Sequence, residues 1–156
     1  MYPQTHFLFV LLLGLTFTKY GYLNWKLSLL AAFLSSVIDI DHYIEHIIHN
    51  KKDRFSLKKT WNDAIHYNKF YEWSFIHRWQ GMLLVTLIVV ILFIFNWTWA
   101  LVIALAYYSH MILDYININY KAKHMVHIKE WKIFIDIPWY EIVFDLLLIL
   151  GIIFLL

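Results

Sequence analysis

The sequence contains no cysteine and few charged residues, and each shortage excludes classes of protein. Without cysteine, the chain cannot be a secreted disulfide scaffold or an iron–sulfur protein. Asp, Glu, Lys and Arg make up 15% of its 156 residues and hydrophobic residues 62%, against about 25% and 45–50% in soluble domains. A soluble domain of this length needs more polar surface, so the composition predicts an integral membrane protein. The formal net charge of +2 gives no reason to expect a nucleic-acid partner.

The longest stretch without a charged side chain runs from Trp79 to Leu113, which is 35 residues. As one helix it would measure about 50 Å, whereas the hydrocarbon core of a bilayer is about 30 Å thick. Two helices joined by a turn fit better. Asn96 is a turn former, and the tryptophans beside it favour the membrane interface. We therefore expect membrane spans at about 74–95 and 98–117.

Three shorter apolar runs reach the length of a membrane span only when their polar flanking residues are included. They predict further spans at about 4–20, 26–48 and 139–156. The expected fold is an all-α, polytopic membrane helical bundle of about five transmembrane helices, which forms a single domain over residues 1–156 with a polar cap on one face.

When these helices alternate across the membrane, every acidic and every imidazole side chain falls on the same face. The acids are Asp39, Asp41, Glu45, Asp53, Asp63, Glu72, Asp114, Glu130, Asp136, Glu141 and Asp145, and the histidines are His6, His42, His46, His49, His66, His77, His110, His124 and His127. Two long loops on that face explain part of this distribution. They do not explain why several of these residues occupy the helix ends themselves, where ionisable groups in a membrane need partners.

The basic residues predict which face this is. Of the 13 Lys and Arg, only Lys19 and Lys26 lie on the opposite face. By the positive-inside rule the polar face is cytoplasmic. We expect a protein integral to the cell (inner) membrane with its polar site facing the cytoplasm, although Lys19 alone would favour the opposite orientation.

The segment Asp39-Ile-Asp41-His42 is the first candidate ligand set. On a continuous helix Asp39 and His42 share a face, and two carboxylates and an imidazole within one turn match the ligands of a divalent cation. The alternative is a helix C-terminal cap that enters a polar loop. Two acids at the negative end of a helix dipole are unfavourable without a cation, which favours metal binding.

Two further pairs are candidates. His110 and Asp114 are four residues apart on one helix face, so both can bind a metal, or Asp114 can orient the imidazole, or the two can simply pair with each other. His77 and Arg78 open the third expected span. His77 is a candidate ligand and Arg78 a candidate phosphate-binding residue, or both are interfacial residues, with Arg78 reaching toward lipid headgroups.

Two positions remain open. By its spacing alone, His6 is an isolated interfacial residue. Asp145 lies one turn inside the last helix from Glu141, and a carboxylate there needs a partner. Asp145 can serve as a ligand, as an outer hydrogen-bond acceptor or as a neutral acid, and the sequence does not decide among these roles.

The ligand types indicate both the metal and the chemistry. Nitrogen and oxygen donors without sulfur suit zinc first, with manganese, iron or magnesium as alternatives. Such an ion activates water, and the resulting nucleophile attacks esters. At a membrane surface the natural substrates are phosphoesters, either in membrane lipids or in small molecules. We expect Asp41 and Arg78 to take part in catalysis.

At these residues the chain resembles the YdjM-like family of inner-membrane metal-dependent hydrolases, which have a distant link to zinc phospholipases C. The resemblance rests on Thr5-His6, Val37-Ile-Asp39-Ile-Asp41-His42, His77-Arg78 and Ser109-His110-Met-Ile-Leu-Asp114. This sequence differs from the family in having Ile38 where the family usually has proline, and in lacking a second histidine after His77-Arg78. The resemblance implies a metal site made of His6, Asp39, Asp41, His42, His77, His110 and Asp114.

The favoured expectation is a membrane-embedded metal-dependent hydrolase, a phosphoesterase acting on a lipid or another phosphoester by way of an activated water. A membrane di-iron oxidase or hydroxylase is an alternative, although the sequence has no His-His pair. A non-enzymatic cation-binding membrane protein is a further alternative. Acids confined to one face argue against a conduction path, because the opposite half of each helix is apolar.

Overall fold

The computed structural model describes residues 2–49, 51–57, 75–120 and 139–156. Most of the two long loops expected on the polar face, at about 49–72 and 118–137, lies outside this described part, including His66, His124 and His127. Every regular element named for the described residues is helical, as expected for an all-α protein. In chain order these elements are α1 (Pro3–Lys19), α2 (Trp25–Val37), α3 (Ile40–His49), the short 3₁₀ helix η2 (Phe75–His77), α5 (Trp79–Phe95), α6 (Trp97–Tyr120) and α7 (Trp139–Leu155).

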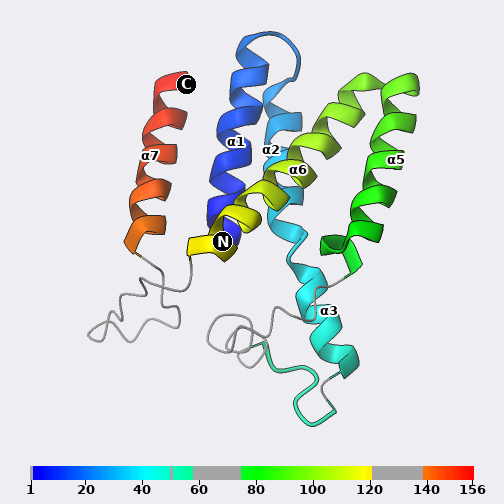
Figure 1. Cartoon of the computed structure of the whole chain (residues 1–156). Coiled ribbons are helices and arrows are strands. Elements are labelled where there is room, and N and C mark those ends of the chain that lie inside the picture. The colour runs from blue at the N-terminus through cyan, green and yellow to red at the C-terminus, as the bar shows by residue number, and fades with distance from the viewer. Residues whose placement is uncertain (1, 50, 58–74, 121–138) are drawn as a thin grey trace.

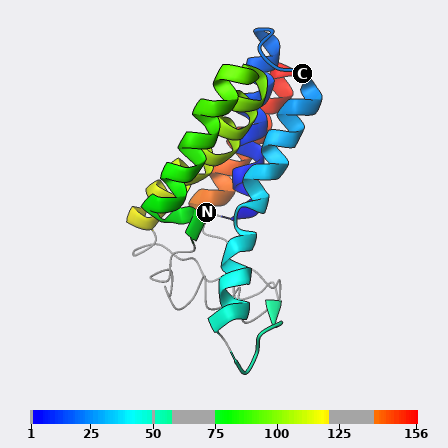
Figure 2. The same cartoon turned by 90° about the vertical axis from the view of Figure 1, so that its right-hand side faces the viewer.

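The helices alternate in direction along the bundle (Figure 1). The chain begins at one end, and the start of α1, the end of α2, the start of α5, the end of α6 and the start of α7 lie at that same end (Figures 1 and 2). Helix α1 packs against α2, α6 and α7, and α6 packs against α2 and α5. The polar helix ends therefore lie at one end of the bundle. At the other end α5 and α6 join at Asn96, where the sequence predicts a turn.

The structure corrects the expected continuous helix 26–48, which is interrupted at Ile38 and Asp39. In a continuous helix the carbonyl oxygen of Ser35 would accept a hydrogen bond from the N–H of Asp39. That oxygen instead accepts one from the ring of His110 on α6, at 2.8 Å. The next hydrogen bonds span three residues, including His42 N–H to the Asp39 carbonyl at 3.2 Å. Asp39 thus stands on a tight turn and not on the helix with His42.

The expected helix 74–95 also begins later than predicted, at Trp79. His77 lies before it, at the end of η2. The hydroxyl of Tyr107 on α6 donates to the carbonyl oxygen of Ile76 at 2.7 Å, and η2 lies directly against Gly81. A Cβ atom at Gly81 would stand 2.8 Å from the Cα of Ile76, so only glycine fits there. These two contacts fold His77 back toward α6.

Helices α1 and α2 approach each other closely because their facing residues are small. A Cβ atom at Gly14 would stand 2.8 Å from the Cβ of Ser28. The hydroxyl groups of Thr18 and Ser28 hydrogen-bond at 2.8 Å, and Ala31 and Ala32 are fully buried. Close contacts between small residues, with hydroxyl hydrogen bonds across them, are typical of helix pairs in membranes.

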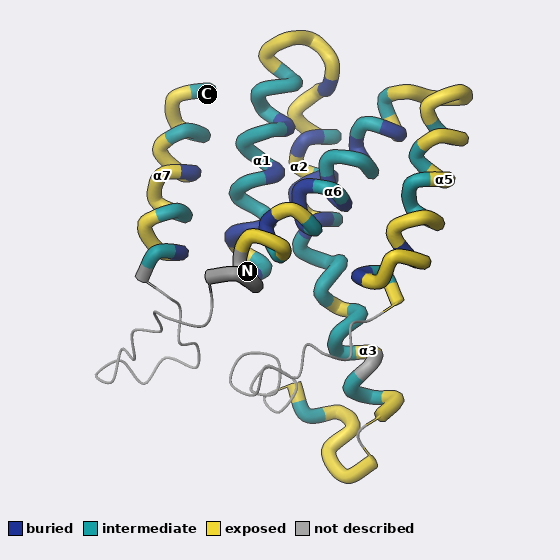
Figure 3. The backbone as a smooth tube through the Cα atoms, viewed as in Figure 1, coloured by how far each residue is buried: buried dark blue, intermediate teal, exposed yellow. Residues whose placement is uncertain are grey.

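Much of the outer side of α5 and α7 is exposed (Figure 3), and the large exposed side chains there are apolar. On α5 the side chains of Phe93 and Ile94 are 69% and 75% exposed, and on α7 that of Phe154 is 84% exposed. By length and composition two segments can cross a membrane, Trp25–His49 and Trp97–Ile116, and Trp79–Phe95 is a shorter apolar helix. These two segments correspond to the expected spans at 26–48 and 98–117. The full set of five spans stays a prediction.

The contact at Gly14 predicts that added volume there separates α1 from α2. Gly14→Ala should lower stability by about 1–3 kcal/mol, the usual cost of overpacking a close contact. Thermal unfolding of the protein in detergent, followed by tryptophan fluorescence, measures this. Gly151→Ala is the matched control, because its nearest neighbour is the movable Cδ1 atom of Leu12 at 3.1 Å. Equal unfolding midpoints for the two variants would contradict this account of the helix contact.

Candidate metal centre

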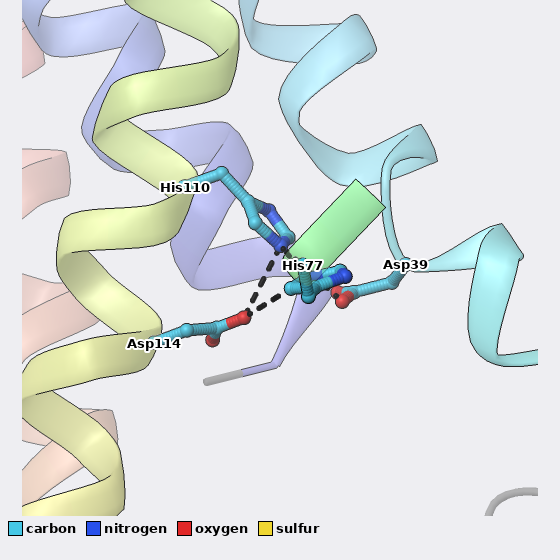
Figure 4. Close-up of side chains that lie close together, drawn as sticks. All are labelled: Asp39, His77, His110 and Asp114. Carbon is cyan, nitrogen blue, oxygen red and sulfur yellow. Dashed lines mark hydrogen bonds and ion pairs between the residues drawn. The ribbon is translucent and has the colours of Figure 1, made fainter. Parts of the chain in front are cut away.

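Four side chains from three segments meet at the polar end of the bundle (Figure 4). Asp39 comes from the turn after α2, and His77 comes from η2. His110 and Asp114 lie one turn apart on α6. One ligand atom of each lies within 4.8 Å of those of the other three. The imidazoles are 5% and 0% exposed and the carboxylates 21% and 18%, so water reaches the group from the carboxylate side.

The hydrogen bonds behind the two imidazoles fix which ring nitrogen carries hydrogen. His110 Nδ1 lies 2.8 Å from the backbone carbonyl oxygen of Ser35, which can only accept. His77 Nδ1 lies 2.9 Å from Oδ2 of Asp41, which as a carboxylate also accepts. Both Nδ1 atoms are therefore donors. In the neutral rings both Nε2 atoms then carry a lone pair directed at the centre.

The two Nε2 atoms are only 3.1 Å apart. Two lone pairs at that distance repel each other, so the arrangement of His77 and His110 requires a positive charge between or beside them. A proton on one ring can supply it, and so can a metal ion. An outer partner on Nδ1, such as the Asp41 carboxylate or the Ser35 carbonyl, is the usual support of a histidine that binds metal through Nε2.

The donor distances are also compatible with a metal ion. Bonds of about 2.0–2.2 Å from zinc to nitrogen and oxygen place tetrahedral donors about 3.3 Å apart. Four such separations are observed: 3.1 Å for His77 Nε2 to His110 Nε2, 3.2 Å for His110 Nε2 to Asp114 Oδ2, 3.5 Å for His110 Nε2 to Asp39 Oδ1, and 3.6 Å for His77 Nε2 to Asp114 Oδ2. These four of the six separations suit a tetrahedral metal site, and the other two, from Asp39 to His77 and to Asp114, are within 4.8 Å.

The charges of the group also suit a divalent ion. Two carboxylates and two neutral imidazoles carry a charge of −2, which one divalent cation balances. Within a poorly solvated helix bundle, uncompensated carboxylates are costly. A single proton shared by His77 and His110 would leave the charge of Asp39 and Asp114 only half balanced.

A second group shares His77 and contains Asp41 and His42. Asp41 lies on the Nδ1 side of His77, away from the Nε2 atom that faces the first group. The ring of His42 stacks on that of His77 at 4.7 Å, and its Nε2 is 3.9 Å from Asp39 Oδ1. The structure thus brings Asp41 and His42 to the outer side of His77. Asp41 stands where an outer hydrogen-bond acceptor orients a metal-binding histidine.

His6, which spacing alone suggests is an interfacial residue, is buried inside the bundle near its polar end. Its side chain is fully buried, and its Nε2 is 3.1 Å from Oδ1 of Asp114, whose other oxygen faces the two imidazoles. The His6 ring also stacks on that of His110, with centroids 3.9 Å apart and planes 23° apart. His6 therefore contacts two members of the four-residue group, Asp114 and His110.

The remaining candidates lie farther out. Arg78 is exposed and forms the N-cap of α5, directly after His77. His46 lies farther along α3 and donates to the carbonyl oxygen of Asp53 at 3.2 Å, and His49 ends that helix. Neither of these histidines belongs to the two groups.

Sequence reasoning misses two features of the centre. The Ser35 carbonyl is a backbone group, and it is available to His110 only because α2 ends there. Tyr107 secures the turn that carries His77. Its position one turn before His110 on α6 is the one sequence signal that points to it.

No family model, curated protein or solved structure matches the chain. The geometry of the four donors is therefore the basis for assigning a function.

The geometry predicts that metal content depends on His110. His110→Ala should lower the divalent metal bound to purified protein more than tenfold, because it removes one of the two imidazole donors. Elemental analysis by mass spectrometry measures this. His49→Ala, on α3 outside both groups, is the control and should keep the wild-type metal content. Equal metal content in the two variants would contradict the assignment.

Proposed function

We propose that this protein is a membrane-embedded metal-dependent hydrolase, a phosphoesterase that acts on a lipid or another phosphoester at the cytoplasmic surface of the cell membrane. The observation that carries the proposal is the set of four nitrogen and oxygen donors within 4.8 Å of one another, drawn from three parts of the chain. The argument has three parts: the membrane, the metal and the reacting groups.

The exposed apolar surface supports a membrane location for the bundle. Helix α5 packs against α6 and η2 and leaves most of its leucine, isoleucine and phenylalanine side chains exposed, and the outer face of α7 is similar. Apolar surface of this extent needs a bilayer or a partner to cover it. In the five-span arrangement α1, α5 and α7 cross the membrane beside the two longer apolar segments.

The donor set fits a bound divalent metal, with zinc as the first choice. His77, His110 and Asp114 supply two imidazoles and a carboxylate, which match the three protein ligands of many catalytic zinc sites. When bound, such an ion activates a water molecule as a nucleophile and polarises a phosphoryl oxygen. Manganese and iron also accept this set of ligands.

The residues on the exposed side of the centre have the roles that hydrolysis requires. Asp39 stands on a turn, is the most exposed of the four donors and is 3.5 Å from His110 Nε2. With His77, His110 and Asp114 as the three protein ligands, the fourth position would be open to water. Asp39 would then stand beside that position and would accept the proton of the bound water, whereas Asp39 as a fourth ligand would close the site. Asp41 holds Nδ1 of His77 and so aims Nε2 inward. Arg78, exposed beside His77, is assigned to bind the phosphoryl oxygens.

The resemblance to the YdjM-like hydrolases supports the same assignment, because the residues that carry it include all four donors. This proposal includes the identity of the metal and the cytoplasmic orientation of the site. It also includes the class of substrate, which is a lipid or a soluble phosphoester. A non-catalytic metal-binding membrane protein is the second candidate, because structural zinc sites use four protein ligands and four donors are present here.

Hydrolysis should depend on the metal and on Asp114. Purified protein in mixed micelles should release product from a phosphomonoester, a phosphodiester or a phospholipid probe. It should lose activity in chelator and regain it with zinc or manganese. Asp114→Asn should lower kcat/KM at least about 100-fold, because it removes a charged donor from the centre.

Asp53→Asn is the matched control, since Asp53 is an exposed acid outside the centre, and this variant should retain activity. Metal binding without activity on any of the three ester classes would favour the non-catalytic candidate. Activity that persists in chelator would contradict the hydrolase proposal.

The proposed orientation has a separate test, because the chain has no cysteine and any introduced thiol is a unique reporter. Tyr22 lies between α1 and α2, and Phe55 lies after α3 at the opposite end. Their side chains are 53% and 76% exposed, so Tyr22→Cys and Phe55→Cys each present an accessible thiol. A membrane-impermeant maleimide should label the first in intact cells and the second only after permeabilisation. The reverse pattern would place the metal centre on the outer side of the membrane.

A further inference from the structure

Glu141 is a fully buried carboxylate that belongs to neither metal-binding group. It lies in the first turn of α7, 1% exposed, and faces the start of α1. Its Oε1 atom accepts two hydrogen bonds, from the backbone N–H of Tyr2 at 2.6 Å and from the hydroxyl of Thr5 at 2.7 Å. Both donors belong to the beginning of α1, so one carboxylate oxygen on α7 ties that turn in place.

The first turn of α1 needs such a partner. The N-cap residue Tyr2 makes no side-chain capping hydrogen bond, and the first turn contains no acidic residue. The first N–H groups of a helix have no partner within it, and a negative charge beside them interacts favourably with the helix dipole. Glu141 supplies both the acceptor and the charge from another helix.

The first turn of α1 also leads directly into His6, which contacts the metal centre. Thr5 precedes His6, and His6 reaches Oδ1 of Asp114 at 3.1 Å while its ring stacks on His110. A shift of the first turn of α1 would therefore move the group that lies behind the Asp114 carboxylate. Glu141 is thus linked to the metal centre by its two hydrogen bonds to the first turn of α1 and by the contact of His6 with Asp114.

We propose that Glu141 is a positioning residue for the metal centre. It holds the first turn of α1 so that the His6 ring stays stacked on His110 and against the Asp114 carboxylate, and α7 thereby contributes to a site to which it gives no donor. The proposal rests on the metal centre proposed above and adds α7 to the elements that support it.

The test measures the affinity of detergent-purified protein for zinc alone. Glu141→Ala should weaken zinc binding about tenfold, the lower end of the effect of losing an outer partner of a ligand. Glu141→Gln keeps an oxygen that can accept both hydrogen bonds and should restore the affinity to within about threefold of the wild type. Thr5→Val removes one donor only and should have a smaller effect in the same direction.

Two comparisons separate positioning from general stability. Leu148→Ala, at a buried position on the same helix, should lower the unfolding midpoint but leave zinc affinity unchanged. In a His6→Ala background, Glu141→Ala and Thr5→Val should cause no further loss of zinc affinity, because the path to Asp114 is already cut.

Each outcome has a distinct meaning. Wild-type protein that binds no zinc at the centre would overturn the proposed function and this inference with it. Wild-type binding with unchanged affinity in Glu141→Ala would overturn this inference alone. Equal losses of affinity for Glu141→Ala and Leu148→Ala, or a full loss for Glu141→Ala in the His6→Ala background, would also overturn it.

Discussion

The approach of two imidazole nitrogens, His77 Nε2 and His110 Nε2, to 3.1 Å is the contact on which the rest of the site depends. Each ring is held from behind by an acceptor, so both nitrogens face each other as acceptors and require a cation. Asp39 and Asp114 bring negative charge to the same point. A divalent ion at that point would balance all of this charge, whereas a proton on one of the two rings would balance part of it.

The two departures from regular helix geometry serve this contact. Interrupting the helix at Ile38 and Asp39 frees the Ser35 carbonyl for His110 and places Asp39 on a turn. Starting α5 at Trp79 leaves His77 on a separate turn that Tyr107 ties to α6. In both places a stretch of chain that the hydrophobic pattern would make helical is bent toward the centre.

The sequence predicts the helical class, most of the helix bounds and the meeting of acids and histidines at one end, because these follow from hydrophobic run lengths and the alternation of helices. It does not predict the two interruptions, since tertiary hydrogen bonds to His110 and Ile76 cause them. For the same reason spacing alone gives His6 no role and leaves Glu141 unassigned. Both acquire a place only when α1, α6 and α7 pack together.

A crystal structure of the protein grown with zinc, with anomalous scattering recorded at the zinc absorption edge, tests the central claim most directly. The account predicts one strong anomalous peak about 2.0–2.2 Å from the Nε2 atoms of His77 and His110 and from a carboxylate oxygen of Asp114, with Asp39 or a water completing a tetrahedron. Absence of a peak there, with the two Nε2 atoms still in direct contact, would mean that a proton and not a metal ion holds the site together.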